Sequence, residues 1–369
     1  MPNPSRPRTA IIHYWLVGMR GGERVLERLL HLFPDADLFT HVHVPEAMSP
    51  IINARPIKTS FIQRLPGARR HYQKYLPLMP MALEHLDLRG YDLVISSESG
   101  PAKGVIVPPG AVHLSYVHSP MRYLWDHYHD YRDTTGRLNR LLMPPLFHYL
   151  RNWDCASAAR VDRFVANSTF IRKRIAKAWR READVVHPPV AVSEFAPTAD
   201  VSPRYLWVGQ MIAYKRPDIV VEAFNRLGLP LLMVGDGDLH QAIQRKAGPN
   251  VEVLKRLDFK SLKQAYASCR ALIFPAEEDF GIVPVEANAS GRPVLAYGRG
   301  GLRDSIVPDV TGLFFDEQTV DSLIAGIEAL ERWLPEFDPA AAVTNAARFA
   351  PERFDDGIRS VLREEGFDA

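Results

Sequence analysis

Two glutamates separated by seven residues, Glu278 and Glu286, are the residues whose types and spacing most clearly indicate chemistry. A carboxylate is repelled by a phosphate group, but it accepts hydrogen bonds from the hydroxyls of a ribose or a sugar ring. We therefore interpret the pair as part of a nucleotide-sugar site, with Glu286 at the ribose and Glu278 at the sugar. The alternative is that Glu286 only complements a helix dipole, a gain of roughly 0.3–1 kcal/mol.

The segment that carries these glutamates is predicted to form a strand, a tight loop and a helix. The apolar run 271–274 suits a buried parallel strand, and Pro275 ends it because proline cannot donate to a ladder. Gly281 permits backbone conformations that other residues resist, and Pro284 fits the first position of a helix, with Glu286 in its first turn. The loop should therefore present backbone N–H groups and a helix N-terminus at the carboxyl end of a strand, where anionic ligands bind.

Composition limits the remaining possibilities. The chain has 369 residues, 46% of them hydrophobic, which is too long for one ordinary core and predicts two domains. A net charge of +2 does not indicate nucleic-acid binding, and two cysteines form neither a disulfide framework nor a zinc motif. No apolar stretch is long enough to span a bilayer, and the N-terminus lacks the features of a signal peptide. We expect a soluble protein on the cytoplasmic side of the membrane.

The first half of the chain alternates short apolar runs with amphipathic segments. Strands are predicted over residues 10–17, 91–96, 104–107, 113–117, 164–167 and 184–187, and helices over 138–160 and 169–179. Another helix should begin at Gly21-Gly22, with Val25 and Leu26 on its inner face and Glu23 outside. The glycines bring backbone amides close to whatever lies opposite, although a plain tight turn is the commoner reason for such a pair.

The second half shows the strand–helix rhythm more regularly. Strands are predicted over residues 205–208, 231–234, 251–254, 271–274, 294–296 and 312–315, with helices such as 219–227 and 239–247 between them. This alternation predicts a parallel, doubly wound α/β sheet with right-handed crossovers. The loops that follow the first two of these strands hold Gln210, Lys215, Arg216 and Gly235. Lys215 is suited to neutralise a diphosphate, although an ordinary surface lysine is the alternative.

Residues 57–81 are basic and aromatic, and they include Lys58, Arg69, Arg70 and Lys74. Such a stretch suits contact with an anionic membrane surface or with a lipid-linked substrate. The alternative is a solvated helix whose Lys and Arg stems cover apolar surface. A second polar cluster, His118 to Arg122, follows a predicted strand and therefore lies in a loop rather than in the core.

These residues resemble the retaining glycosyltransferases of family 4, whose signature is a pair of glutamates spaced as Glu278 and Glu286 are. Further matching motifs fall in family order: Gly21-Gly22-Glu23-Arg24, His118-Ser-Pro-Met-Arg122-Tyr, Asn167-Ser168, His187-Pro-Pro-Val, Tyr214-Lys215-Arg216, Gly235-Asp-Gly and Gly298-Arg-Gly-Gly301. The phrases LFPDADLFT and GRPVLAYGRGG resemble in particular a bacterial branch with mannosyltransferases of O-antigen and exopolysaccharide synthesis. The resemblance covers essentially the whole chain.

The resemblance implies the GT-B architecture, in which two Rossmann-like domains face a cleft. Residues 1–190 would form the acceptor-binding domain, 191–345 the nucleotide-sugar domain, and 346–369 a helix that returns to the first domain. It also implies transfer of a sugar, most simply mannose from GDP-mannose, to a lipid-linked glycan at the inner face of the bacterial cytoplasmic membrane. Neither a metal nor another cofactor would be needed, and no nucleic acid would bind.

Residue roles follow from the same resemblance. Glu286 would hold the ribose, Glu278 and His118 the donor sugar, and Lys215 the diphosphate, with Gly21 and Gly22 approaching it. The remaining donor contacts would come from Gln210, Arg216, Gly235, Phe280, Gly281, Ile282 and Val283. The acceptor or membrane contacts would come from Arg122 and from the basic residues Lys58, Arg69, Arg70 and Lys74.

One position departs from the family pattern, because many relatives carry Arg where this chain has Gln210. Glutamine keeps a hydrogen-bond donor but loses the charge and the bidentate fork that suit a phosphate. Arg216 is the candidate that would compensate in part.

Catalysis would rest on donors that stabilise the leaving diphosphate, one oxygen of which would accept the acceptor's proton. Glu278 as a covalent nucleophile is the less favoured alternative.

Three other functions share parts of this pattern. A nicotinamide oxidoreductase would have the same sheet, but no Gly-x-Gly-x-x-Gly follows the first strand. A glycosidase also uses two carboxylates but needs no phosphate-binding loops. A non-catalytic GT-B partner protein should have lost Glu278, Glu286 or Lys215, and all three are present. Within the family, a UDP- or dTDP-sugar donor is the alternative to GDP-mannose.

Overall fold

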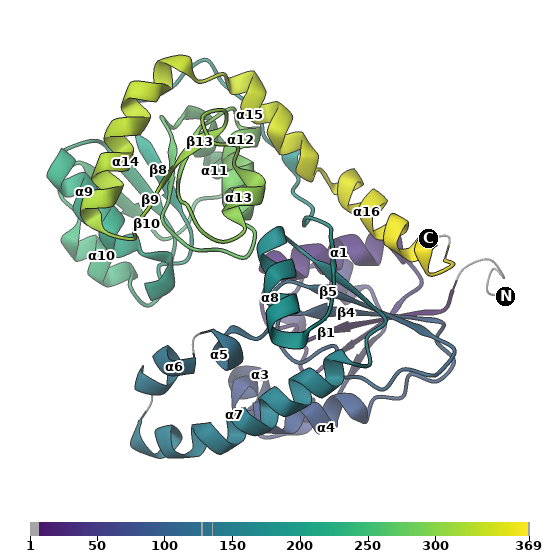
Figure 1. Cartoon of the computed structure of the whole chain (residues 1–369). Helices are drawn as coiled ribbons and strands as arrows, with labels where there is room; N and C mark the ends of the chain where they lie inside the picture. The colour runs from purple at the N-terminus through teal and green to yellow at the C-terminus, as the bar shows by residue number, and fades with distance from the viewer. Residues whose placement is uncertain (1–6, 127, 135, 368–369) are drawn as a thin grey trace. The chain divides into compact units, whose positions relative to one another are not determined.

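The computed structural model describes residues 7–126, 128–134 and 136–367, and the chain forms two compact units (Figure 1). The first unit comprises Met1–His187 with Phe354–Ala369, and the second comprises Pro188–Arg353. Each unit is built on one parallel sheet, of seven strands in the first unit and six in the second. The prediction of a doubly wound α/β fold with two Rossmann-like sheets is confirmed.

The sheet of the first unit has the strand order β3-β2-β1-β4-β5-β6-β7. Its strands are β1 (Thr9–His13), β2 (Asp37–Thr40), β3 (Ile57–Thr59), β4 (Leu93–Glu98), β5 (Val112–Val117), β6 (Arg163–Ala166) and β7 (Asp184–Val185). Its α-helices are α1 (Gly21–Leu32), α2 (Pro50–Asn53), α3 (Ala68–His71), α4 (Met79–Glu84), α5 (Arg122–Trp125), α6 (Tyr128–Thr134), α7 (Arg137–Ala158), α8 (Thr169–Trp179) and α16 (Pro351–Glu364).

Both faces of this sheet are buried under helices. Successive strand residues point to opposite faces, so Ile11 packs with α1 and α16, whereas Ile12 packs with α4 and α7. This explains why β1 is apolar along most of its length. Helix α8 begins where the Ser168 side chain accepts a hydrogen bond from the Ile171 amide, a standard N-cap.

The sheet of the second unit has the strand order β10-β9-β8-β11-β12-β13. Its strands are β8 (Tyr205–Val208), β9 (Leu231–Val234), β10 (Val251–Leu254), β11 (Leu272–Phe274), β12 (Val294–Tyr297) and β13 (Gly312–Phe315). Its α-helices are α9 (Pro217–Leu227), α10 (His240–Lys246), α11 (Phe259–Ser268), α12 (Ile282–Ala289), α13 (Leu302–Ser305), α14 (Val320–Trp333) and α15 (Pro339–Ala346). Helices α9, α10 and α14 cover one face, and α11, α12, α13 and α15 cover the other (Figure 1).

Some predicted elements of the first unit were wrong or incomplete. Residues 104–107 form a loop and not a strand, because β4 pairs directly with β5 and leaves no place between them. A side chain at Gly104 would collide with the ring of Trp153, so this loop is pressed against α7 instead. The basic stretch is not one long helix: it contains β3, two short α-helices and two 3-10 turns, Phe61–Arg64 and Tyr72–Leu78.

Helix α16 is remote in sequence from the first sheet but packs against it. Phe354, Ile358 and Leu362 are buried in the same cluster as Leu26 of α1. The carboxylate of Asp355 accepts two hydrogen bonds from the guanidinium of Arg28, at 2.7 and 2.5 Å. The C-terminal segment therefore completes the hydrophobic core of the first unit.

Candidate active site

In the second unit, the loops that follow β8 and β11 bring a predicted cation and a predicted carboxylate together. Lys215 ends a 3-10 turn, Ala213–Lys215, and its Nζ lies 3.0 Å from Oε1 of Glu278. Both side chains remain partly exposed. These residues are far apart in sequence, but both follow neighbouring parallel strands, whose carboxyl ends meet at one edge of the sheet.

The loop before α12 is shaped by contacts with the glycine-rich segment after β12. Gly301 donates its amide to the Glu278 carbonyl at 2.8 Å, and a Cβ at Gly300 would lie 2.4 Å from that carbonyl oxygen. Gly281 is the residue before α12 and has φ of +92°, a conformation that favours glycine. The glycines thus permit two loops to approach at the N-terminus of α12, where the first amides of the helix have no intrahelical acceptor.

The start of this helix differs from the prediction. Helix α12 begins at Ile282, so Pro284 is its third residue and Glu286 lies beyond the first turn. Ile282 and Val283 are partly exposed at the helix start. Phe280 is buried and packs against Phe349 with ring centroids 5.3 Å apart, so only its backbone is available to a ligand.

Glu286 is oriented by a residue that the sequence analysis missed. The hydroxyl of Tyr266, on α11, donates to Oε2 of Glu286 at 2.7 Å. Burial, with the nearby charge of Glu286, raises the pKa of Tyr266 well above its usual value, so the phenol stays protonated and remains a donor. Glu286 itself is only partly buried, and the interaction fixes one of its oxygens.

Three other residues predicted to contact the donor, Gln210, Arg216 and Gly235, differ in their exposure and in their contacts. Gln210 is exposed in the loop after β8. The guanidinium of Arg216 donates to both oxygens of Asp218 and to the Gln318 carbonyl, so it is held in place by the protein itself and is a poor substitute for a phosphate-binding arginine. A Cβ at Gly235 would lie 1.7 Å from the carbonyl oxygen of Gly209, so this glycine allows the two strand exits to pack closely.

In the first unit, Gly22 and His118 lie side by side. A Cβ at Gly22 would be 3.7 Å from Nε2 of His118 and 2.7 Å from the hydroxyl of Tyr14. Gly21 and Gly22 open α1, while His118 directly follows β5. Burial, with a smaller contribution from His13, lowers the pKa of His118 to about 3, so the imidazole is neutral at physiological pH.

Behind His118 lies a row of polar side chains that the sequence analysis did not find. Ser97 Oγ is 2.9 Å from Nε2 of His118 and 3.0 Å from Nδ1 of His13. Nε2 of His13 lies 3.5 Å from Oε1 of Glu23. The prediction that Glu23 faces outward was wrong: it is 2% exposed, and its other oxygen caps α1 by accepting the Arg20 amide at 2.9 Å.

The ionisation of Glu23 is maintained despite its burial. Burial opposes the charged form, but the hydrogen bond and charge of His13, together with the backbone amides of Glu23 and Arg20, outweigh it and lower the pKa of Glu23. Helical periodicity placed Glu23 outside because it ignored this capping role. A glutamate at the third position of a helix was the available signal for it.

A second buried polar cluster supports the same loop. Lys103 is wholly buried and its Nζ contacts Asp154 and, at 3.4 Å, Glu98. The other oxygen of Asp154 accepts hydrogen bonds from the indoles of Trp125 and Trp179, at 2.8 and 2.7 Å. Burial favours a neutral amine, but the two carboxylates outweigh it and raise the pKa of Lys103. Because the Glu98 carbonyl accepts the His118 amide at 2.8 Å, the cluster fixes the backbone that carries His118.

The predicted acceptor and membrane contacts are not all equally accessible. Arg69, Arg70 and Lys74 are exposed, whereas Arg122 is partly buried at the start of α5. Lys58 is paired: its Nζ lies 2.9 Å from Asp37 Oδ2 and 3.1 Å from the Tyr91 hydroxyl. Lys58 is therefore better explained as part of the β2–β3 edge than as a free basic residue.

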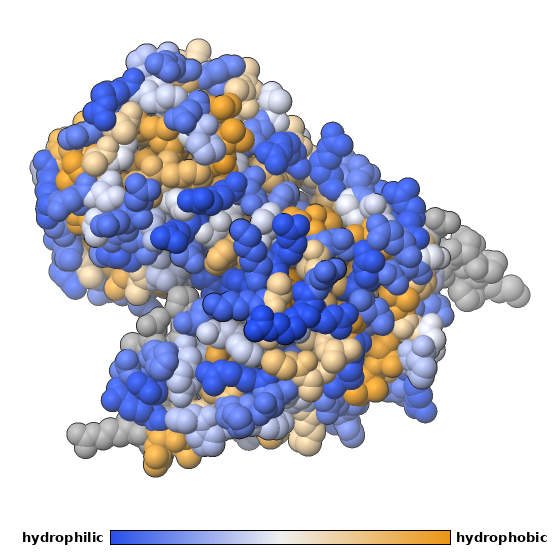
Figure 2. All heavy atoms as spheres, in the orientation of Figure 1, coloured by the Kyte–Doolittle hydropathy of each residue, from blue (hydrophilic) through white to orange (hydrophobic). Residues whose placement is uncertain are grey.

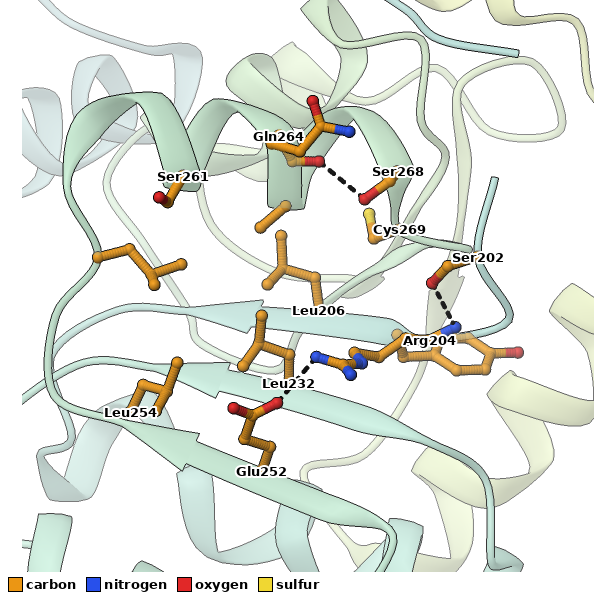
Figure 3. Close-up of a pocket in the computed structure, with 13 residues that line it drawn as sticks. Ser202, Arg204, Leu206, Leu232, Glu252, Leu254, Ser261, Gln264, Ser268 and Cys269 are labelled. Atoms are coloured by element: carbon orange, nitrogen blue, oxygen red, sulfur yellow. Dashed lines mark hydrogen bonds and ion pairs between the residues drawn. The ribbon is translucent and has the colours of Figure 1, made fainter. Parts of the chain in front are cut away.

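A pocket of 390 Å³ in the second unit does not coincide with these residues (Figure 3). It lies between α11 and the sheet edge, with Leu206, Leu232 and Leu254 on the sheet side. Arg204 and Glu252 form an ion pair at its rim, 2.8 Å apart. None of the residues predicted to bind a donor lines this pocket.

Among the described residues, no helix is long and apolar enough to cross a membrane.

Comparisons with known proteins agree with this architecture. HepE of Anabaena, solved in complex with UDP and glucose, superposes with a TM-score of 0.68 over 97% of this chain and 100% of its own, at 16% identity. The apo lipopolysaccharide outer core galactosyltransferase WaaB gives 0.67 over 97% and 99%, also at 16% identity. These similarities show the GT-B fold.

The curated sequence relatives align with a smaller part of the chain than the solved structures do. An uncharacterized glycosyltransferase of Methanocaldococcus jannaschii is 26% identical over 167 residues, 44% of this chain and 47% of the relative. A D-inositol 3-phosphate glycosyltransferase of Mycobacterium marinum is 28% identical over 232 residues, 55% and 50% of the two chains. The chain thus matches about half the length of these curated relatives.

Two family models match consecutive parts of the chain. Residues 19–194 match the model described as Glycosyltransferase Family 4, and residues 194–336 match that of Glycosyl transferases group 1. Their order follows the two units of the structure, and each match contains predicted site residues: His118 in the first, and Lys215, Glu278 and Glu286 in the second. On this evidence the chain belongs to the family 4 glycosyltransferases.

Proposed function

We propose that the chain is a retaining hexosyltransferase that moves mannose from GDP-mannose to a hydroxyl of a lipid-linked glycan in the synthesis of a cell-surface polysaccharide. The single observation that carries the transferase proposal is the 3.0 Å contact between Lys215 and Glu278, made by two strand-exit loops beside the N-terminus of α12. A cation, free helix amides and a carboxylate are the groups that a diphospho-sugar requires in one place.

In the proposed mechanism the protein mainly stabilises the departing diphosphate. Cleavage of the bond between sugar and phosphate creates negative charge on the leaving group and positive charge on the sugar. Lys215 and the amides of Ile282 and Val283 oppose the negative charge from fixed positions. A diphosphate oxygen accepts the proton of the acceptor hydroxyl, so that attack and departure occur on the same face of the sugar.

The carboxylates take the roles that the family resemblance implies. Glu286, held by Tyr266, accepts hydrogen bonds from the ribose, and Glu278 accepts them from the sugar. The ion pair with Lys215 lowers the electrostatic cost of holding the Glu278 carboxylate near a diphosphate. We propose that the reaction needs no metal ion, which predicts full donor turnover in the presence of EDTA.

A UDP-sugar is the second candidate donor, because HepE was solved with UDP and glucose. We prefer GDP-mannose because the segments LFPDADLFT and GRPVLAYGRGG resemble those of bacterial mannosyltransferases. A donor panel separates the two: purified protein is incubated with GDP-mannose, UDP-glucose, UDP-N-acetylglucosamine and dTDP-rhamnose. Slow hydrolysis and a raised melting temperature with GDP-mannose alone are expected. A response to a UDP-sugar alone contradicts the mannosyl proposal, and a response to none contradicts the transferase proposal.

For the acceptor, we propose that the first unit meets an anionic membrane surface. Arg69, Arg70 and Lys74 are exposed, and the neighbouring α4 and α7 expose Met81 and, at 74%, Leu141. Basic side chains beside exposed apolar ones suit an interfacial site. Hydrophilic residues otherwise dominate the face of the molecule seen in Figure 2, with smaller hydrophobic areas between them. Co-sedimentation with anionic but not with neutral vesicles is expected, and equal binding to both contradicts this proposal.

Replacement of Lys215 tests the assigned catalytic role. Lys215→Ala should reduce donor hydrolysis by a factor of about 10² to 10³, as removal of one oxyanion donor does in other enzymes. Lys246→Ala, which removes an exposed lysine at the end of α10, is the matched control and should leave the rate unchanged. Normal turnover by Lys215→Ala contradicts the role of Lys215, whatever the identity of the donor.

A further inference from the structure

The ion pair between Lys215 and Glu278 joins two side chains whose main chains are held in place. The Glu278 carbonyl accepts the Gly301 amide at 2.8 Å, and Glu278 also forms a parallel bridge with Gly300. The turn that ends at Lys215 is closed by a 3.1 Å hydrogen bond from the Lys215 amide to the Ile212 carbonyl. The two side chains therefore meet from fixed main-chain positions on two different loops.

Only one oxygen of the Glu278 carboxylate is engaged by the protein. Oε1 lies 3.0 Å from Nζ of Lys215 and 3.5 Å from the hydroxyl of Tyr214. Among the residues that the structure describes, none makes a hydrogen bond or ion pair with the other oxygen, Oε2, and the side chain is 18% exposed. An ionised carboxylate accepts about four hydrogen bonds and donates none. Oε2 is therefore open to a ligand that brings hydroxyl donors, as a sugar does.

The same carboxylate is unfavourable for a diphosphate that carries no sugar. Glu277, Glu278 and Asp279 place three acidic residues in consecutive positions of the loop before α12, beside the proposed diphosphate site. Lys215 brings a single positive charge, which it must share between Glu278 and the diphosphate, and like charges repel at short range. A nucleoside diphosphate thus meets an opposing charge, whereas a sugar nucleotide also brings hydroxyls that hydrogen-bond to that charge.

We propose that Glu278 makes the site distinguish the sugar nucleotide from the nucleoside diphosphate that remains after transfer. While the sugar is present, its hydroxyls donate to the carboxylate and offset the repulsion between Glu278 and the diphosphate. Once the sugar has been transferred, the carboxylate opposes the diphosphate and favours its release. Because this role rests on the proposed transferase function, it assigns Glu278 a part after the transfer as well as before it.

A structural cross-link between the two loops is the other explanation of the ion pair. That explanation predicts that loss of the pair lowers the melting temperature and weakens the binding of both ligands alike. Discrimination by Glu278 predicts that the two ligands respond differently, because only the sugar nucleotide donates hydroxyls to the carboxylate. The ratio of the two dissociation constants therefore separates the explanations, since specificity is a difference of two binding free energies.

The test removes the charge of Glu278 and keeps the shape of its side chain. In Glu278→Gln the nucleoside diphosphate should bind more tightly than in the native protein, because Lys215 is no longer shared with a carboxylate. The sugar nucleotide loses its charge-assisted hydrogen bonds, so its advantage over the nucleoside diphosphate should fall by about tenfold. Calorimetric titration of the full chain with GDP and GDP-mannose, and with UDP and UDP-glucose, measures the ratio for the pair that the native protein binds.

The preceding residue provides a matched control. Glu277 is partly exposed in the same loop, and its side chain makes no hydrogen bond or ion pair within the described part of the chain. Glu277→Gln removes the same charge, so it should change the affinities for both ligands by the same factor and leave their ratio unaltered. Glu278→Asp decides the matter if Glu278→Gln does not fold. It keeps the charge but withdraws it from the sugar, so the ratio should fall through weaker binding of the sugar nucleotide alone.

The possible results separate this role of Glu278 from the transferase function. An unchanged ratio in Glu278→Gln overturns the discrimination proposed for Glu278, as does weaker binding of the nucleoside diphosphate by this variant. Either result leaves the transferase proposal standing, because the native protein still binds the sugar nucleotide. If the native protein binds none of the four ligands, the transferase proposal itself fails, and the discrimination by Glu278 fails with it.

Discussion

At the scale of single residues, the hydroxyl of Tyr266 provides a direct test of the proposed role of Glu286 at a ribose. Tyr266→Phe removes the 2.7 Å hydrogen bond but keeps the buried ring. Without this hydrogen bond the Glu286 side chain must be ordered when the ligand binds, at a cost of roughly 0.5–1.5 kcal/mol, so the affinity for the nucleoside diphosphate should fall by about two- to tenfold. Calorimetric titration of the native and variant proteins measures this change.

The second unit contains a control of the same chemistry away from the site. The hydroxyl of Tyr205 donates to the carboxylate of Glu331, on α14. Tyr205→Phe should therefore leave nucleotide affinity unchanged. If both variants weaken binding equally, the effect of Tyr266 is a general loss of structure and not a loss of orientation at Glu286.

These residues also show what the sequence alone predicts and what it does not. The meeting of Lys215 with Glu278 was predictable in principle, because both follow parallel strands and carboxyl ends share one edge of a sheet. The burial of Glu23 and the contact of His13 with Ser97 depend on the register of β1 against β4, which no local pattern specifies. No sequence pattern indicates the role of Tyr266, since periodicity gives the face of a helix but not the partner of a hydroxyl.

At the scale of elements, α16 is the segment whose importance is least evident from its position in the chain. Ile358 is fully buried between α1 and the first sheet. Ile358→Ala should destabilise the first unit by about 2–5 kcal/mol, the usual cost of removing a large buried aliphatic side chain. Calorimetric unfolding should show this loss in the transition of the first unit and leave the transition of the second unit unchanged.

Ser360→Ala on the exposed side of the same helix is the appropriate control, because it removes no buried group and alanine favours a helix. No loss of stability is expected for it. If Ile358→Ala left the unfolding temperature of the first unit unchanged, α16 would contribute little to the stability of the core, contrary to the packing observed.

Elements were predictable where the sequence marks both their ends. Strands β8, β9, β10 and β13 lie where they were predicted, since glycine, proline or other polar residues bound each run. Strands β2 and β3 were missed because they are short and contain polar residues such as Asp37 and Lys58. Their side chains pair with each other across the sheet edge, a contact that appears only once the strands are aligned.

At the scale of the whole molecule, three histidines should make the stability of the first unit more sensitive to acid than that of the second. Burial lowers the pKa of His41 to about 4 and those of His113 and His118 to about 3, and all three belong to the first unit. Each is neutral in the folded state and takes up a proton on unfolding below its ordinary pKa of about 6.5. Their contribution to stability is therefore complete above pH 6.5 and is lost as the pH falls toward the folded-state pKa values.

The size of this effect follows from linkage, at about 1.4 kcal/mol per pH unit for each such histidine. Between pH 6.5 and 5 the calorimetric transition of the first unit should move to lower temperature more steeply than that of the second. His113→Gln should remove one histidine's share of this slope, whereas His31→Gln, which replaces an exposed ring on α1, should leave it unchanged. An undiminished slope in His113→Gln would mean that His113 already binds its proton in the folded protein. The acid sensitivity of the first unit between pH 6.5 and 5 would then have to arise from groups other than His113. Glu23 is not one of them, because its pKa is lowered from the ordinary value of 4.5 and its contribution to stability disappears only below that pH.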